Sequence, residues 1–138
     1  MNYNTSILEI DHSRTNFANI ILEEIRVCEA SVKKRYIGSV NLLKVKGTTH
    51  PKYINKSWSE LLDELGRKSP RAKSNIQHLK DNPNYYFNDE EKETWSFYKR
   101  NDDYYIDQGN HRTILARYFF YLNNITPIIH GIIIKEIN

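Results

Sequence analysis

The stretch Asp107-Gln108-Gly109-Asn110-His111-Arg112 lies where a run of β-prone residues gives way to a run with helical periodicity. Residues 95–98 and 104–106 are aromatic or apolar, and the turn-like segment 100–103 between them predicts a β-hairpin. Apolar residues recur at helical spacing over residues 114–122, so we expect a helix to begin close to Asn110, a favoured capping type. The sequence therefore predicts a strand, a tight turn and a helix in direct succession.

The chemistry of this turn favours a bound anion. Gly109 allows the backbone to turn sharply and another molecule to approach closely. The N–H groups of the first helical turn point outward with the positive end of the helix dipole. His111 and Arg112 are unfavourable at this end of a helix, and such a local cost suggests a functional demand. We therefore expect an anion to bind where the helix begins.

In this context Gly109-Asn110-His111-Arg112 resembles the Gly-x-His-Arg turn of the ParB/sulfiredoxin-like superfamily. Residues 125–129 look like the family's next strand and residues 36–45 look like its opening strand. The resemblance covers roughly residues 36–134. It implies an α/β (α+β) fold of the ParB/sulfiredoxin type, with a small mixed sheet and flanking helices.

The resemblance also implies a site, because in that family the turn holds the phosphate of a nucleotide or nucleic acid. By resemblance, Arg112 would contact a phosphate and His111 would contact or protonate an oxygen. The backbone of Gly109 and Asn110 would line the cradle beside Gln108. Phosphate-directed chemistry is implied, as in a ParB-like nuclease or nucleotide hydrolase, with a nucleotide as ligand or substrate and a divalent cation such as Mg²⁺ sharing the charge.

Two other functions stay open at this point. One is a non-catalytic module that senses a nucleotide or assists a DNA-associated protein while doing no chemistry. The other is a small-molecule kinase, since the same turn is compatible with phosphoryl transfer to a hydroxyl group. The intact His111-Arg112 pair favours an enzyme. Gln108 favours the module, because it stands directly before the glycine, where an acidic residue would support catalysis.

Departures from the family pattern narrow these expectations. Members with sulfiredoxin activity carry a reactive cysteine where this chain has Asn110, so sulfinic acid repair is not expected. Many members have an acidic residue directly before the glycine, whereas here Gln108 takes that place and Asp107 lies one residue earlier. Asp107 is a catalytic candidate, but strand side chains alternate between faces, so this shift can turn its carboxylate away from the site.

A basic segment provides a second candidate surface. Residues 67–80 carry five cations and no acidic residue, and residues 81–93 are predominantly acidic. The functional interpretation is a groove that follows a nucleic-acid backbone, with DNA favoured as the partner. Its predicted contact residues are Arg67, Lys68, Arg71 and Lys73. The structural interpretation is a solvated helix face beside a solvated acidic loop.

The remaining predictions concern the scaffold. Helical spacing of apolar residues predicts a helix over residues 15–33 with Cys28 buried on its apolar face, so residues 1–35 would be an N-terminal helical segment packed on a domain formed by residues 36–138. Residues 57–60 have the spacing of a capping box, and Gly66 is placed to end that helix. A further helix is predicted from Ser69-Pro70 to about Leu79.

Composition limits the class of protein. The 138 residues contain a single cysteine, which excludes a disulfide framework and Cys-x-x-Cys zinc sites. No basic segment followed by an apolar run marks a secretory signal, and the apolar run 125–134 is too short for a membrane-spanning helix. We therefore expect a cytoplasmic protein without a membrane partner.

Overall fold

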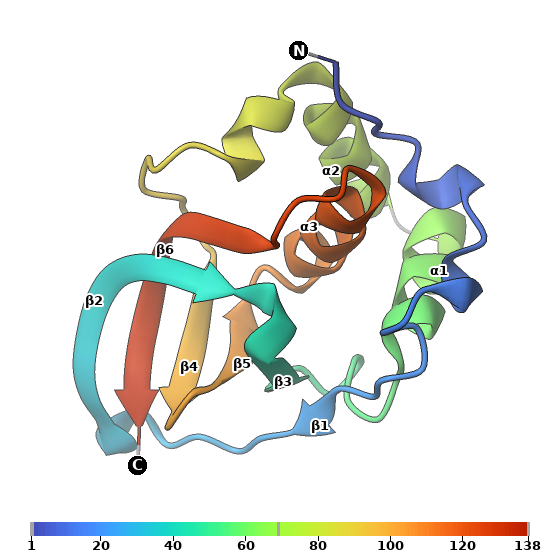
Figure 1. Cartoon of the computed structure of the whole chain (residues 1–138). Helices are drawn as coiled ribbons and strands as arrows, with labels where there is room; N and C mark the ends of the chain where they lie inside the picture. The colour runs from blue at the N-terminus through green and yellow to red at the C-terminus, as the bar shows by residue number, and fades with distance from the viewer. Residues whose placement is uncertain (1, 69, 138) are drawn as a thin grey trace.

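The computed structural model describes residues 2–68 and 70–137, and the side chains of residues 67, 68, 70 and 71 lie outside that description. In this part of the chain, six strands form one mixed sheet and three α-helices gather on one side of it (Figure 1). The strands and α-helices are β1 (Glu23–Glu24), β2 (Val32–Asn41), β3 (Val45–Thr48), α1 (Trp58–Lys68), α2 (Pro70–Asp81), β4 (Ser96–Arg100), β5 (Asp103–Gln108), α3 (Asn110–Leu122) and β6 (Ile128–Ile137). The 3₁₀ turns are η1 (Ile7–Glu9), η2 (His12–Arg14), η3 (Glu29–Ser31), η4 (Leu42–Lys44) and η5 (Pro83–Tyr86). A mixed α/β fold is thus confirmed.

The hairpin expected around residues 100–103 forms the centre of the sheet. The strand order is β1-β3-β5-β4-β6-β2, and β4 and β5 are its antiparallel middle pair. β3 runs parallel to β5 and β6 runs parallel to β4, while β2 pairs antiparallel with β6 at the edge. This order places the end of β5, and the turn that follows it, beside the end of β3 (Figure 1).

α3 lies at the centre of the main core. Its residues 113–120 are all buried, because the helix is packed against β5, α1, α2 and the N-terminal η1 turn. A helix that is apolar on nearly all sides is stable only when it is enclosed in this way. A smaller cluster of Ile25, Tyr98 and Ile137 covers the opposite face of the sheet.

The Trp95 side chain packs against the turn between β5 and α3 and holds it in place. Gly109 has a left-handed backbone with φ +89°, and a Cβ atom added there would lie 2.4 Å from Cδ1 of the Trp95 indole. The Trp95 Nε1–H donates to the Thr113 hydroxyl at 2.9 Å, and that hydroxyl donates to the Gly109 carbonyl at 2.8 Å. Glycine is therefore required by the protein's own packing, whereas the sequence suggested close approach of a ligand.

The predicted helix over residues 15–33 is wrong. This segment contains β1, the single 3₁₀ turn η3 and the first two residues of β2. Its backbone bonds to other parts of the chain: the Ile25 N–H, for example, donates to the Thr48 carbonyl. The edge of β3 has backbone N–H and C=O groups that β1 and Ile25 can bond. In a helix, the backbone of the segment would bond to itself, and these groups of β3 would lose their partners. Phe17 and Leu22 still reach the main core, so the segment packs on the sheet and helices. Cys28 is exposed, contrary to the expected buried position.

The helices before the hairpin agree more closely with expectation. The capping box is confirmed, since the Glu60 N–H donates to the Ser57 hydroxyl at 3.1 Å and the Ser57 N–H donates to the Glu60 carboxylate at 3.3 Å. Gly66 does not end α1, which continues to Lys68. α2 reaches Asp81, two residues beyond the expected end, and Ser69 lies outside the described residues.

The predicted strands shift at their ends. The strand expected over residues 36–45 is divided, because β2 ends at Asn41 and η4 separates it from β3. The strand expected to begin at residue 125 begins at Ile128 and continues to Ile137. Both differences arise because pairing between β2 and β6 sets the lengths of these strands, and no sequence pattern reports that pairing.

Replacing Gly109 with alanine should destabilise the fold by about 2–5 kcal/mol, because a left-handed backbone costs an L-residue about 1–2 kcal/mol and overpacking adds about 1–3. The matched control is Gly66→Ala in α1, whose added methyl group has the flexible side chain of the 40% exposed Leu8 as its nearest neighbour, at 3.2 Å. That change should stabilise the protein by up to about 1 kcal/mol. Urea unfolding followed by fluorescence measures both, and equal midpoints for the two variants would contradict this account.

Candidate functional site

A cavity of about 960 Å³ opens at the N-terminal end of α3. All six residues of the stretch 107–112 line it. The other walls come from the segment after β3, from α2, from η5 and from the loop that precedes β4. These walls contribute His50, Tyr53, Asn75, His78, Tyr85 and residues 91–94. The segment singled out by the sequence therefore borders a hollow large enough for a small ligand.

Asn110 fastens the start of α3 to the sheet. Its side-chain Oδ1 accepts a hydrogen bond from the Thr48 hydroxyl at 2.7 Å, and the residue is buried. The same Thr48 oxygen accepts from the His50 N–H at 3.1 Å. The contact thus joins the end of β3, the first residue of α3 and the segment that carries His50.

His111 is hydrogen-bonded to a tyrosine of the facing wall. Its Nε2 atom lies 2.7 Å from the Tyr53 hydroxyl, and the two rings meet edge to face. The His50 ring also packs against Tyr53, with 4.6 Å between ring centroids. Burial, together with the charge of Lys52, lowers the pKa of His50, which favours its neutral form. Two imidazoles and one phenol therefore form a continuous row along the cavity.

Arg112 directs both terminal nitrogens toward acceptors of its own chain. Nη1 donates to the Tyr85 hydroxyl at 2.7 Å and to the Glu93 carbonyl at 3.0 Å, while Nη2 donates to the carbonyl and hydroxyl of Thr94. The guanidinium also lies 5.0 Å from the centre of the Trp95 ring. These contacts hold the loop at Thr94, whose φ is +54°. Arg112 is thus a structural clamp that also brings positive charge to the cavity wall.

A buried lysine holds the rest of that loop. Lys92 is 2% exposed, and its ammonium group donates to the carbonyls of Asn88, Glu90 and His130 at 2.8–3.0 Å. Burial lowers the pKa of Lys92. Its own N–H donates to the Gly131 carbonyl at 2.8 Å, so the loop is joined to β6. Two cations, Lys92 and Arg112, therefore hold the loop that forms this wall of the cavity.

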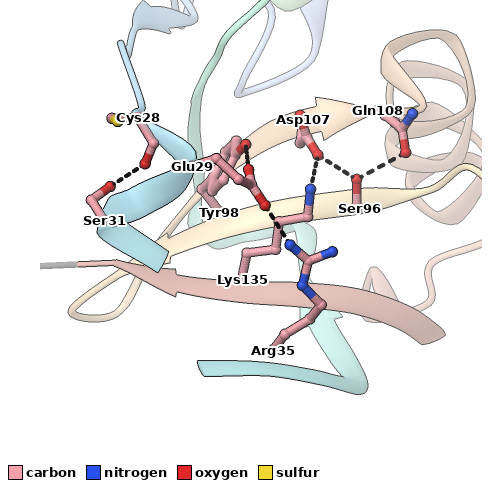
Figure 2. A network of polar contacts seen from close by, with 9 residues as sticks. All are labelled: Cys28, Glu29, Ser31, Arg35, Ser96, Tyr98, Asp107, Gln108 and Lys135. Atoms are coloured by element: carbon pink, nitrogen blue, oxygen red, sulfur yellow. Dashed lines mark hydrogen bonds and ion pairs between the residues drawn. The ribbon is translucent and has the colours of Figure 1, made fainter. Parts of the chain in front are cut away.

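The carboxylate of Asp107 is engaged by β6 and β4. Its Oδ2 atom accepts from the Lys135 ammonium at 2.9 Å and from the Ser96 hydroxyl at 2.8 Å (Figure 2). Both members of the ion pair are largely buried, with side-chain exposures of 18% for Asp107 and 14% for Lys135. Gln108 is exposed, and its Oε1 lies 3.4 Å from the same hydroxyl. Asp107 borders the cavity, but its charge is balanced by Lys135.

The polar network continues across the face of the sheet away from the α-helices (Figure 2). The Tyr98 hydroxyl donates to Glu29 at 3.3 Å, and Glu29 also pairs with Arg35 of β2. Burial, with the negative charges of Asp107 and Glu29, raises the pKa of Tyr98 to about 12. This phenol therefore stays protonated and joins the N-terminal segment to the central strands.

The predicted nucleic-acid contacts are only partly described. Lys73 is exposed on α2, while the side chains of Arg67, Lys68 and Arg71 lie outside the described residues. Asn75 and His78 of the same helix line the cavity. Two residues correspond to about 200° of rotation around a helix, so Lys73 points away from the face that carries Asn75. The groove hypothesis stays a prediction that is separate from the cavity.

Sequence reasoning missed several cavity residues. No spacing pattern connects His50 and His78 to the turn, so the sequence does not mark them as cavity residues. Tyr53 gave no signal, since its partner His111 is 58 residues away in the sequence. The fold brings these residues together by placing α2 and the end of β3 on two sides of one turn.

Searches of structure and sequence add no further assignment. Within residues 2–68 and 70–137, no group of three or more His, Cys, Asp and Glu side chains is arranged to hold a metal ion. No helix in that part of the chain has the length and apolar character needed to cross a membrane. No protein-family model matches the chain, and no curated protein or solved structure gives a significant match to it. The interpretation of the site therefore depends on its own geometry.

Replacing Asp107 with asparagine should lower the free energy of unfolding by about 1.5–3 kcal/mol, the usual value of a hydrogen bond to a charged group. The reason is that Lys135 would keep a largely buried charge without its carboxylate partner. Urea unfolding measures the effect. Lys46→Gln is the matched control, because its ion pair with Asp103 is 3.8 Å long and more exposed, so stability should change by less than about 1 kcal/mol. An unchanged stability in Asp107→Asn would return Asp107 to the candidates for chemistry.

Proposed function

We propose that this chain is a ParB/sulfiredoxin-like domain of the cytoplasm, and that its cavity binds and acts on the phosphate of a nucleotide or nucleic acid. The observation that carries the proposal is the position of the turn: residues 107–112 border a cavity of about 960 Å³ at the N-terminus of a 13-residue helix. The motif begins where β5 ends, its Gly109 has a left-handed backbone, and α3 begins at Asn110. This succession of strand, turn and helix supports the family resemblance. A nuclease or nucleotide hydrolase is the corresponding activity.

The expected chemistry combines binding with proton transfer. N–H groups of the first turn of α3 point toward the helix end and stabilise a phosphate together with the helix dipole. Arg112 contributes positive charge at the wall, rather than the direct phosphate contact that the resemblance implies, because its terminal nitrogens already donate to the chain. His111 is suited to act as an acid or base, since an imidazole titrates near neutral pH.

A divalent cation fits this site less well. Mg²⁺ usually takes one or two carboxylates from the protein together with phosphate oxygens. The carboxylate nominated by the sequence, Asp107, is bound to Lys135 and Ser96 through Oδ2. Glu91 and Glu93 also border the cavity, but they lie on the exposed rim of the loop. No step of the proposal therefore depends on a metal ion.

A second candidate is a binding module that does no chemistry. Two observations favour it: Asp107 is neutralised by Lys135, and the Arg112 guanidinium is held by the loop at residues 93–94. Such a module would bind a nucleotide through the helix terminus without turning it over. Calorimetric titration with phosphate, pyrophosphate and nucleoside mono- and triphosphates, followed by assays for phosphate release and DNA nicking, separates the two candidates.

Arg112→Ala should weaken binding of a mononucleotide by roughly 1.5–2 kcal/mol, the Coulomb energy of a unit charge about 8–10 Å from the phosphate at an effective dielectric constant of about 20. It should also destabilise the fold, because the loop at residues 93–94 loses its clamp. Arg112→Lys retains the charge but cannot reproduce four directed contacts, so it should recover only part of either loss. Calorimetry measures affinity, and urea unfolding measures stability. The comparison variant Arg26→Ala removes a 91% exposed arginine that does not line the cavity, and it should change neither quantity appreciably. Wild-type affinity in both Arg112 variants would remove the residue from the binding site.

The nucleic-acid hypothesis is tested by the dependence of binding on salt. If the basic segment follows a phosphate backbone, Arg71→Gln combined with Lys73→Gln should reduce the logarithmic salt slope by up to about 2, given about 0.7–0.9 per phosphate contact. Mononucleotide affinity should stay unchanged, because Lys73 does not line the cavity. Fluorescence anisotropy of labelled single- and double-stranded DNA provides the slopes. Salt-independent binding of wild-type protein to both forms would eliminate the basic groove and leave a small phosphate ligand.

A further inference from the structure

The hydroxyl group of Tyr53 lies beside a base inside the candidate cavity. Tyr53 Oη is 2.7 Å from Nε2 of His111, and both residues line the cavity at the start of α3. A hydrogen bond of this length between a hydroxyl group and an imidazole is the arrangement that activates a weak nucleophile. The position is independent of the Gly-x-His-Arg pattern, since Tyr53 comes from the segment after β3.

His50 supports the orientation of this phenol. Its ring packs 4.6 Å from the Tyr53 ring, and its Nδ1 atom accepts from the Lys52 N–H at 3.1 Å. In its neutral form the ring therefore carries its proton on Nε2. The Tyr53 N–H donates to the His50 carbonyl at 3.0 Å, which holds the two residues in one turn. The phenol thus contacts two imidazoles, and His111 is hydrogen-bonded to its hydroxyl.

Tyr85 lines the same cavity but has a different neighbour. Its hydroxyl accepts a hydrogen bond from Arg112 Nη1 at 2.7 Å. A guanidinium remains protonated in proteins and cannot remove a proton from a phenol. Of these two cavity tyrosines, Tyr53 is therefore the one whose oxygen is placed to become a nucleophile.

We propose that Tyr53 is the nucleophile of a phosphoryl-transfer reaction and that His111 is its base. The proposal rests on the proposed function, because it requires a phosphate ester or anhydride in the cavity. Tyr53 Oη forms a bond to phosphorus, and the bond from phosphorus to the leaving oxygen breaks with its electron pair. The phenolic proton passes to His111 Nε2 and then to the leaving oxygen, and no atom is oxidised or reduced. The product is a phosphotyrosine or a nucleotidyl-tyrosine.

The test is incubation of the full chain with magnesium salts of ATP, GTP and CTP and with acetyl phosphate, followed by acid quenching and intact mass spectrometry. A phosphotyrosyl bond survives acid, whereas a phosphohistidine does not, so the quench separates Tyr53 from His111 as the modified residue. Peptide mapping locates the adduct, and its mass distinguishes a phosphoryl group from a nucleotidyl group. Calorimetry with the same donors runs in parallel and tests binding by itself.

An acid-stable adduct on Tyr53 is the expected result. Tyr53→Phe should lose the adduct while retaining donor affinity, and His111→Gln should slow its formation by about 100-fold or more. The matched control is Tyr105→Phe, because Tyr105 packs against the small cluster on the opposite face of the sheet. That variant should acquire the adduct on Tyr53 at the wild-type rate.

The alternative outcomes fall into separate classes. Binding without an adduct from any donor, an acid-labile adduct, or an acid-stable adduct that persists in Tyr53→Phe overturns the assignment of Tyr53 and leaves the cavity as a phosphate site. Absence of binding to every donor overturns the proposed function itself. The two failures are thus distinguished by the calorimetric measurement.

Discussion

The contact between the Trp95 indole and the Gly109 turn is the constraint on which the candidate site depends. Trp95 occupies the space that a side chain at position 109 would need, and its Nε1–H reaches the Thr113 hydroxyl, which donates back to Gly109. One buried ring therefore fixes the left-handed turn and the first turn of α3 together. Because Asn110, His111 and Arg112 follow directly, their positions are consequences of this packing.

Several cationic side chains in this protein donate hydrogen bonds to backbone carbonyl groups that lie outside the α-helices and strands. Lys92 and Arg112 donate to the carbonyls of the loop before β4, and Arg117 donates from α3 to the Leu42 carbonyl at 3.0 Å. Burial lowers the pKa of Arg117 to about 10, and the Phe17 ring 4.1 Å from its guanidinium carbon partly compensates for the lost solvation. Positive charge near the cavity thus has a structural role even without a ligand. Arg112 of the motif is therefore explained in part by the loop that it holds, and not by phosphate binding alone.

The local patterns in the sequence were reliable where one element determines its own structure. Aromatic, β-prone residues on both sides of a turn-like segment predicted the β4–β5 hairpin, and the Ser57-to-Glu60 spacing predicted the start of α1. The same kind of pattern failed over residues 15–33, because the edge of β3 binds the backbone of that segment more effectively than the segment's own helical bonds would. The spacing of apolar residues predicts which side chains are buried, but an irregular segment can bury the same side chains as a helix.

The sequence by itself determined the strand, the glycine turn and the helix at residues 103–122, since turn chemistry and helical periodicity are local properties. It also nominated the residues of that turn that border the cavity. Only the tertiary structure decided what their side chains do: Asp107 pairs with Lys135 across the sheet, and His111 meets Tyr53. The physical reason is that these contacts join residues 28 and 58 positions apart in the sequence. Residues so far apart meet only when the strand order and the packing of the helices bring them together.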